Sequence, residues 1–230
     1  GDSVGTVAIK IAAGSIMDLG HNTNNESSIS KEIIVDNTKP TISFSNPKVI
    51  ENDNTNHFNN THSNINHKTQ YTMTITEAHF EHSLTSDTYT GTYSNGMGAG
   101  GVLLVTTGGV SCTTIIISGT GLTQTITIGG CSGNGTLAIK IAANSILDES
   151  NNYNDESNTS TSVTIDNTKP TISFSNPKVV ENDNTNHFNN THANTNHKTQ
   201  YTMTITESHL YYSLTADTYT GTYSNGMGAG

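Results

Sequence analysis

Residues 36–100, which begin DNTKPTISFSNP and end TYTGTYSNGMGAG, decide the architecture because they return at residues 166–230 with only eight changes. The same shift of 130 residues carries GTVAIKIAAGSIMD at 5–18 onto GTLAIKIAANSILD at 135–148. An internal repeat of this length sets the architecture before any local pattern does. The sequence therefore predicts three parts: the closing part of one repeat at 1–36, a complete repeat at 37–166 and the opening part of the next at 167–230.

Both terminal parts are incomplete repeats. Residues 1–36 match 131–166, residues 167–230 match 37–100, and neither end carries a copy of 101–130. Isolated parts of this kind expose strand edges and half of a core. We therefore expect the chain to be a window on a longer array, in which neighbouring repeats of the same chain are its main partners.

The composition indicates a folded, acidic chain. Only 31% of the residues are hydrophobic and 12% are charged, and the formal net charge is −10. All nine basic residues are lysines, so the chain has no guanidinium groups for phosphate recognition. A phosphate backbone needs a basic surface, so we expect no nucleic-acid partner. No apolar run approaches the length of a membrane span and no signal peptide starts the chain, so we expect no membrane insertion in this segment.

Alternating β-branched runs between turn residues predict an all-β chain of tandem β-sandwich domains with Greek-key connections. The run QYTMTIT at 70–76 alternates cleanly and places Tyr71, Met73 and Ile75 on one face. Residues 51–68, ENDNTNHFNNTHSNINHK, have no usable periodicity and predict a surface loop. Further strands are expected at 41–45, 84–92, 102–106, 113–117, 123–128, 136–143 and 162–165, with a flexible turn at 91–100 and one helical turn after 143.

The two cysteines of the chain, Cys112 and Cys131, flank two Thr/Ile runs that surround the turn residues Gly119-Thr120-Gly121. A hairpin over this stretch sets the two cysteines across from each other. The spacing predicts a cross-strand disulfide, which implies an oxidising, extracellular setting. Two buried free thiols are the alternative.

The chain resembles the bacterial immunoglobulin-like tandem repeats of very long secreted adhesins and surface filaments. The resemblance rests on YTMTITEAHF at 71–80, on SGTGLTQTITIGGC at 118–131 with the residues that follow it, and on VTIDNTKPTISFS at 163–175. It covers nearly the whole repeat. It implies immunoglobulin-like sandwiches arranged as beads on a string, and a stalk or shaft module with no catalytic role.

A calcium site at the joints is the sharpest site hypothesis. In a sandwich of this topology, the entry to the first strand, the loop after the second strand and the loop before the last strand lie at one pole. Oxygen donors converging there suit Ca²⁺, which takes six to eight ligands. The alternative is that the aspartates cap a turn, which Asx side chains do well. The candidate ligands are Asp36, Asn37, Glu77, Asp148 and Asn152, with Asp166, Asn167 and Glu207 at the next joint.

Other side-chain patterns point to weaker functions. Histidines recur every five residues at His57, His62 and His67, and again at His187, His192 and His197, but a solvated loop explains this spacing better than a metal site does. No residue set indicates catalysis. We expect a structural repeat of an extracellular stalk or filament. The alternative is a glycan- or protein-binding module that uses the 51–68 loop and a Tyr-rich tract, defined as Tyr89, Tyr93, Tyr211 and Tyr212.

Overall fold

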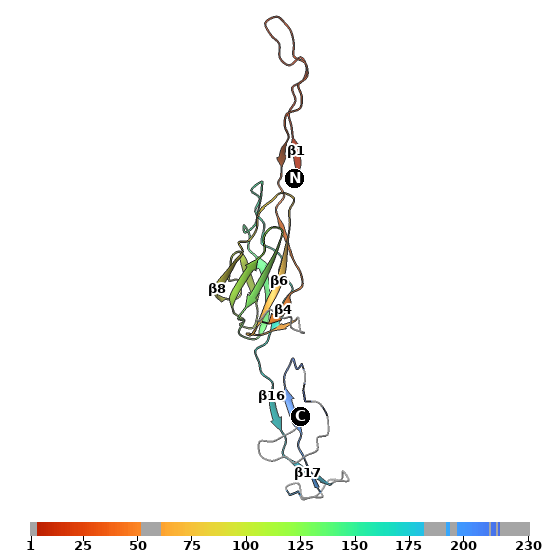
Figure 1. The fold of residues 1–230 in the computed structure, drawn as a ribbon, viewed down its shortest axis with the longest axis vertical. Coiled ribbons are helices and arrows are strands. Elements are labelled where there is room, and N and C mark those ends of the chain that lie inside the picture. Colours follow the sequence, from red (N-terminus) through yellow and green to blue (C-terminus); the bar gives the residue numbers. More distant parts are fainter. Residues whose placement is uncertain are drawn as a thin grey trace. The chain divides into compact units, whose positions relative to one another are not determined.

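A computed structural model describes residues 4–51, 61–181, 192–193, 197–211, 213–214 and 216 of the chain. All regular secondary structure in these residues is β-strand, as the sequence predicts. Two compact units divide the chain, Gly1–Asn167 and Thr168–Gly230. Each unit has its own paired strands (Figure 1).

The first unit contains a six-stranded antiparallel sheet. Strand β6 (His67–Thr76) is its longest member, and it pairs with β3 (Thr41–Phe44), β4 (Lys48–Glu51) and β12 (Thr123–Gly129). The sheet then continues through β11 (Cys112–Ser118) to β8 (Asp87–Tyr93). The β11–β12 hairpin turns at the glycines that the sequence indicates, because Gly119 and Gly121 both have a positive φ that an L-residue rarely adopts.

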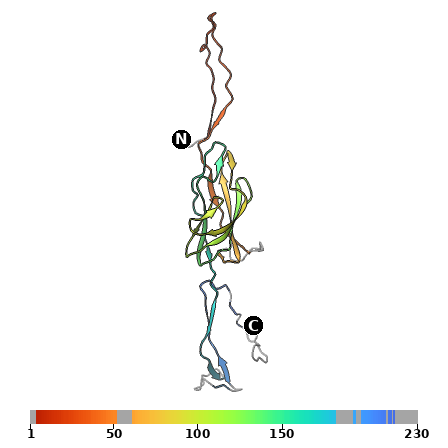
Figure 2. The ribbon, with the colours of Figure 1, turned by 90° about the vertical axis from the view of Figure 1, so that its left-hand side faces the viewer.

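A second, five-stranded sheet lies in the same unit. Its order is β5 (His62–Ser63), β15 (Val163–Ile165), β13 (Gly135–Ile141), β10 (Val102–Thr106) and β9 (Gly98–Ala99). Strand β15 pairs with β5 in the parallel sense, whereas the other pairs are antiparallel. A small ladder of β7 (Phe80–His82) with β14 (Leu147–Asp148) completes the unit. Figures 1 and 2 show the strands from two sides.

One cluster of buried apolar side chains joins the two sheets, which is the arrangement of a β-sandwich. The predicted inward faces are confirmed: Tyr71, Met73 and Ile75 on β6 are buried, and so are the three alternate residues of β13. The Tyr71 hydroxyl donates a hydrogen bond of 3.1 Å to the carbonyl of Leu137, which joins the two sheets inside the core. Burial raises the pKa of Tyr71 above the usual tyrosine range.

Three local predictions are wrong in part. The expected surface loop at 51–68 contains strand residues at both ends and β5 inside it, while 52–60 lie outside the described residues. Residues 91–100 form the end of β8, a tight turn and β9 rather than one flexible turn. The segment after residue 143 forms β14 and no helical turn. Strands β5 and β14 pair with β15 and β7, which are distant in sequence, and local composition does not report such pairing. Strand β9 pairs with β10, which follows it directly.

Residues 4–35 form an arm of two antiparallel segments held by β1 (Gly5–Val7) and β2 (Ile33–Val35) (Figure 2). This arm repeats the pairing of β13 with β15, since Gly5↔Val35 corresponds to Gly135↔Ile165. The burial of the two copies differs: Ile9 is 68% exposed, whereas its counterpart Ile139 is 0% exposed. The strand pairing is therefore local, while burial depends on the rest of the sandwich.

Side chains that bond across this arm are the ones that both copies keep. Residues 19–35 and 149–165 differ at twelve of 17 positions, and the retained residues are Asn22/Asn152, Asn24/Asn154, Glu26/Glu156, Ser27/Ser157 and Ser30/Ser160. All five bond back to the preceding segment in both copies. In this chain, therefore, the residues that stay the same where the two copies otherwise differ are residues whose side chains have a bonding partner.

The second unit keeps the strand pairs of an opening half. Strand β16 (Thr171–Phe174) pairs with β19 (Met203–Thr206), and β17 (Lys178–Glu181) pairs with β18 (His197–Gln200). Their registers are those of β3 and β4 on β6 with 130 added to each number, for example Thr171↔Thr206 for Thr41↔Thr76. Ile172 and Phe174 are exposed in this unit.

Candidate functional site

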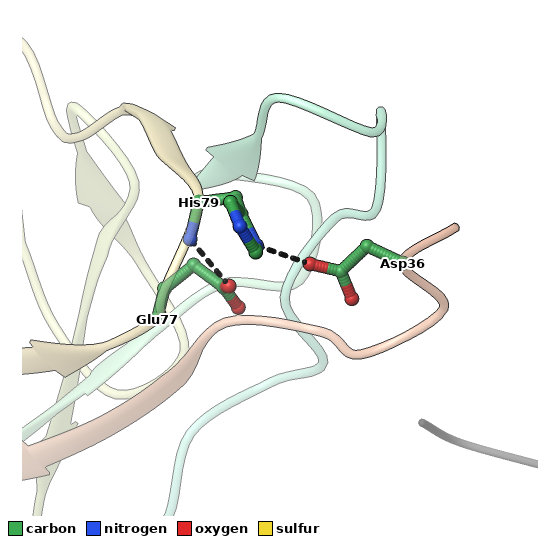
Figure 3. Close-up of side chains that lie close together, drawn as sticks. All are labelled: Asp36, Glu77 and His79. Atoms are coloured by element: carbon green, nitrogen blue, oxygen red, sulfur yellow. Dashed lines mark hydrogen bonds and ion pairs between the residues drawn. The ribbon is translucent and has the colours of Figure 1, made fainter. Parts of the chain in front are cut away.

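Three side chains that can bind a metal ion lie together where the chain enters the sandwich: Asp36, Glu77 and His79 (Figure 3). Asp36 lies between β2 and β3, and the other two residues lie between β6 and β7. The Nδ1 atom of His79 is 3.0 Å from Oδ2 of Asp36. One ligand atom from each residue lies within 4.8 Å of the other two.

The surroundings of Asp36 hold its carboxylate in place. Its side chain is 0% exposed, and its Oδ1 atom accepts hydrogen bonds from both the backbone N–H and the hydroxyl of Thr38, the former at 2.9 Å. These bonds, assisted by His79, lower the pKa of Asp36 below the usual aspartate range. The free face of the carboxylate, Oδ2, points to His79, so this side chain is oriented before any ligand arrives.

Glu77 and His79 form the more accessible side of the cluster. The Glu77 Oε1 atom accepts hydrogen bonds from the backbone N–H groups of Ala78 at 2.7 Å and His79 at 3.1 Å, which closes the turn after β6. The His79 side chain is 26% exposed. Solvent and small ions therefore reach the cluster from the His79 side.

Asp148 and Asn152 form a separate hydrogen-bonded loop lock. Asp148 is fully buried; its Oδ1 accepts from the backbone N–H groups of Ser150 and Asn152, both at 2.8 Å, and its Oδ2 accepts from Asn152 Nδ2 at 2.8 Å. The same Nδ2 group donates to the carbonyl of Asp36 at 3.0 Å, and the Glu149 N–H donates to the carbonyl of His79 at 2.7 Å. The three loops expected at one pole of the sandwich therefore do converge.

This donor set does not fit the calcium site that the sequence predicts. Both oxygens of Asp148 already accept N–H groups, three in all, and Asn152 presents its amide nitrogen, which is not a calcium ligand, to Asp36. The third member of the cluster is an imidazole nitrogen, and calcium takes oxygen ligands. The sequence-based alternative, in which Asp36 caps a turn, describes its Oδ1 bonds to Thr38.

The remaining predicted ligands have other partners. Asn37 is exposed, whereas its counterpart Asn167 is tied to the first unit by four hydrogen bonds. Its Oδ1 accepts from the Ile65 N–H at 2.9 Å, and its Nδ2 donates to two carbonyls of residues 131–133. The Asp166 N–H donates to the carbonyl of Ser63 at 2.9 Å. Within the second unit, Glu207 accepts from the His209 N–H at 3.1 Å, as Glu77 does from His79.

The predicted disulfide between Cys112 and Cys131 is present, with a Cα–Cα distance of 4.0 Å. Both cysteines are buried in the core cluster. The adjacent pair Ser111 and Ser132 exchanges two backbone hydrogen bonds, so the disulfide lies at the next cross-strand position of the β11–β12 hairpin. The bridge therefore closes the open end of this hairpin.

Sequence reasoning missed His79 as a member of the site. Its partner Asp36 is 43 residues away, and no local spacing connects the two. The internal repeat carries a signal that was available: in the diverged segment 77–82, only Glu77 and His79 are unchanged in the second copy. That segment contains four of the eight changes between the two copies of 36–100.

The other candidate features are more dispersed. A shallow depression in the first unit is lined by His82, Leu84, Tyr89, Gly100 and Ser145, among others, and includes one member of the Tyr-rich tract. Of the evenly spaced histidines, His62 and His67 belong to strands β5 and β6. His57, His187 and Tyr212 lie outside the described residues.

No family model, curated protein or solved structure matches this chain. Its function is therefore inferred from its own repeats and geometry.

Proposed function

We propose that this chain is a stretch of the shaft of an extracellular adhesin or surface filament, built from tandem immunoglobulin-like sandwiches of the bacterial kind. Its role is mechanical: it spans distance and presents one surface many times. Further repeats of the same chain are its direct neighbours, and identical chains are its partners where shafts associate. The proposal assigns no catalytic activity to the chain.

The observation that carries this proposal concerns the DNTKP segment, which occurs at 36–40 and 166–170. In the first unit, one copy is hydrogen-bonded to the sandwich before it and the other copy to the sandwich after it. Asn167 is bonded to the sandwich that precedes it through residues 65 and 131–134. Asp36 is bonded to the sandwich that follows it through His79 and Asn152. Because both segments read DNTKP, we infer that every internal joint of an array carries both sets of bonds. Such a joint leaves little free linker and resists bending.

The location outside the cell rests on the disulfide. A bridge that forms within the core persists in oxidising compartments and is rare in reducing ones. The described residues contain no helix with the length and apolarity needed to cross a membrane. A divalent cation at the joint would add a further restraint to the shaft; calcium is the ion that the sequence predicts, and the donors at Asp36 favour another choice.

Electron microscopy of lengthened chains tests the shaft proposal. One, three and six copies of residues 37–166 are placed between 1–36 and 167–230, so that both natural ends are kept. A shaft with clamped joints has an end-to-end distance that grows in proportion to the number of repeats. Replacing every joint asparagine, as in N167A, shifts the growth toward the square root of the number of repeats, as for flexibly linked beads. Square-root growth in the unaltered chain would refute the proposal.

A ligand-binding module is the second candidate, favoured by the depression beside Tyr89. A half-buried tyrosine next to a polar hollow suits a sugar ring or an extended peptide. Chemical-shift mapping of the full chain with a panel of glycans tests it. Shifts confined to residues 82–89 and 100–101, and lost in Y89A, support binding. Unchanged spectra leave the shaft as the better account.

A further inference from the structure

We propose that Asp36, Glu77 and His79 bind a divalent transition-metal cation, with zinc preferred over calcium, at the entry to the complete repeat. This inference goes beyond the shaft proposal and does not depend on it, because the three residues lie within one unit.

The donor types select the class of cation. Two carboxylates and one imidazole nitrogen form a mixed nitrogen–oxygen set, which suits zinc, cobalt and related ions. Calcium takes six to eight oxygens and gains nothing from an imidazole. The oxygens of Asp148, which the sequence predicts as further ligands, already accept three N–H groups. The chemistry at this joint therefore differs from the all-oxygen site that the sequence predicts.

The distance between the two best-placed donors fits a small cation. Tetrahedral ligands about 2.0 Å from zinc lie about 3.3 Å from one another. The His79 Nδ1 and Asp36 Oδ2 atoms are 3.0 Å apart and face each other. An ion that binds between them replaces their hydrogen bond, and the His79 proton then resides on Nε2. A rotation of the Glu77 carboxylate brings a third ligand to the ion, and a water molecule takes the fourth position.

Charge also favours a cation here. Asp36 and Glu77 bring two negative charges, and His79 brings no positive charge when its ring is neutral. The lysine closest along the chain, Lys39, forms an ion pair with Asp155 at 2.7 Å instead. A bound divalent ion balances the two carboxylates, one of which is fully buried.

The internal repeat gives an independent observation that points to these side chains. Across 19–35 and 149–165, the residues retained amid changes are those with a side-chain partner. Across 77–82 and 207–212, residues 78, 80, 81 and 82 all change, and only Glu77 and His79 are kept. The ring of His79 bonds to Asp36, and that residue is kept as Asp166. The retained set therefore coincides with the proposed ligands.

Titration of the metal-free full chain with Zn²⁺, Co²⁺ and Ca²⁺ tests the proposal. Calorimetry measures affinity, and the visible absorption of Co²⁺ reports nitrogen and carboxylate ligation. The sequence holds two copies of the three residues, so the main variant is H79N/H209N, with H79N alone removing the first copy. The matched control is H82N, because His82 is exposed, lies three residues away and is replaced by Tyr212 in the second copy.

We expect zinc to bind at least tenfold more tightly than calcium. H79N/H209N lowers the zinc affinity at least tenfold and abolishes the Co²⁺ absorption band, while H82N changes neither. Far-UV circular dichroism checks that each variant remains folded. Zinc binding that survives in H79N/H209N places the ion at the other histidines and overturns the proposal, as does calcium binding of equal or greater strength. Neither of these results affects the shaft proposal, which electron microscopy of the lengthened chains tests separately.

Discussion

Substituting Asp148 by asparagine tests the loop lock most directly, because the change keeps the shape of the side chain and removes one acceptor. Asn152 Nδ2 donates to Asp148 Oδ2 at 2.8 Å and to the Asp36 carbonyl at 3.0 Å. In D148N, an N–H₂ group faces this Nδ2. Asn152 cannot turn its amide round without losing the bond to Asp36. The new N–H₂ group at position 148 and the Nδ2 group of Asn152 therefore face each other, and a buried N–H donor is left without an acceptor.

The magnitude follows from the bonds that change. The lost bond to a buried carboxylate contributes about 2 kcal/mol, and the two remaining bonds to Oδ1 weaken when the charge is removed. We expect D148N to lower the free energy of unfolding by about 3 kcal/mol. Urea denaturation of the full chain, followed by near-UV circular dichroism of its tyrosines, measures the difference.

The chain supplies a matched control in D18N. Asp18 makes the same local bonds, accepting from the Gly20 and Asn22 N–H groups at 2.8 Å and from Asn22 Nδ2 at 3.1 Å, but it is exposed. Among the residues that the structure describes, Asn22 Nδ2 bonds only to Asp18, so its amide is free to turn round. D18N should leave the urea midpoint unchanged. Equal effects of D18N and D148N, or a loss below about 0.5 kcal/mol in D148N, would show that this reasoning is wrong.

Three further predictions concern the core of the complete repeat. Reduction of the Cys112–Cys131 bridge, which spans 19 residues, should lower the free energy of unfolding by about 3 kcal/mol through loop entropy, measured as a shift in the urea midpoint; an unchanged midpoint would contradict this. Burial raises the pKa of Tyr71, so its contribution to stability is complete below the unfolded pKa of about 10 and falls as pH rises above it; the loss between pH 9 and pH 11 should be smaller in Y71F, and equal slopes would exclude Tyr71 as its source. Gln124 is buried, accepts from the Leu84 N–H at 3.1 Å and donates to the Leu84 carbonyl at 2.7 Å; Q124A should cost about 2–4 kcal/mol and speed hydrogen exchange at the Leu84 amide, which a purely space-filling role would leave slow.

Sequence periodicity predicts the strands whose side chains alternate between core and solvent. The residues of β6 and β13 show this clearly, and Tyr71 and Ile139 are both buried as expected. The two-residue strands β5 and β14 pair with β15 and β7, which lie far away in the sequence. Their side chains carry no period-2 pattern because the pairing depends on backbone groups. No single-window pattern could therefore place them.

In the candidate site, too, some residues can be predicted from the local sequence, whereas others depend on contacts with distant residues. Asp36 and Glu77 are predictable, because each follows a strand and carries oxygen donors at one pole of the sandwich. The role of Asp148 differs from the prediction because the backbone N–H groups of its own loop reach its carboxylate before any ion does. His79 joins the site because β3 pairs with β6, which sets the segment of Asp36 beside the turn after β6, and the Glu149 N–H holds the backbone of that turn.

The arm at 4–35 shows which part of a repeat keeps its hydrogen bonds without the rest of the sandwich. The N–H groups of Ile9 and Ile11 donate to serine hydroxyls at 2.9 Å, as those of Ile139 and Ile141 do at 2.9 and 2.8 Å. These bonds are the same whether the isoleucines are exposed or buried. The closing arm can therefore pair before the core forms around it. In an array, the opening halves of neighbouring repeats are nearly identical, whereas the closing arms have diverged. If an arm prefers to pack with the opening half of its own repeat and not with that of a neighbour, the residues responsible must therefore lie in the arm.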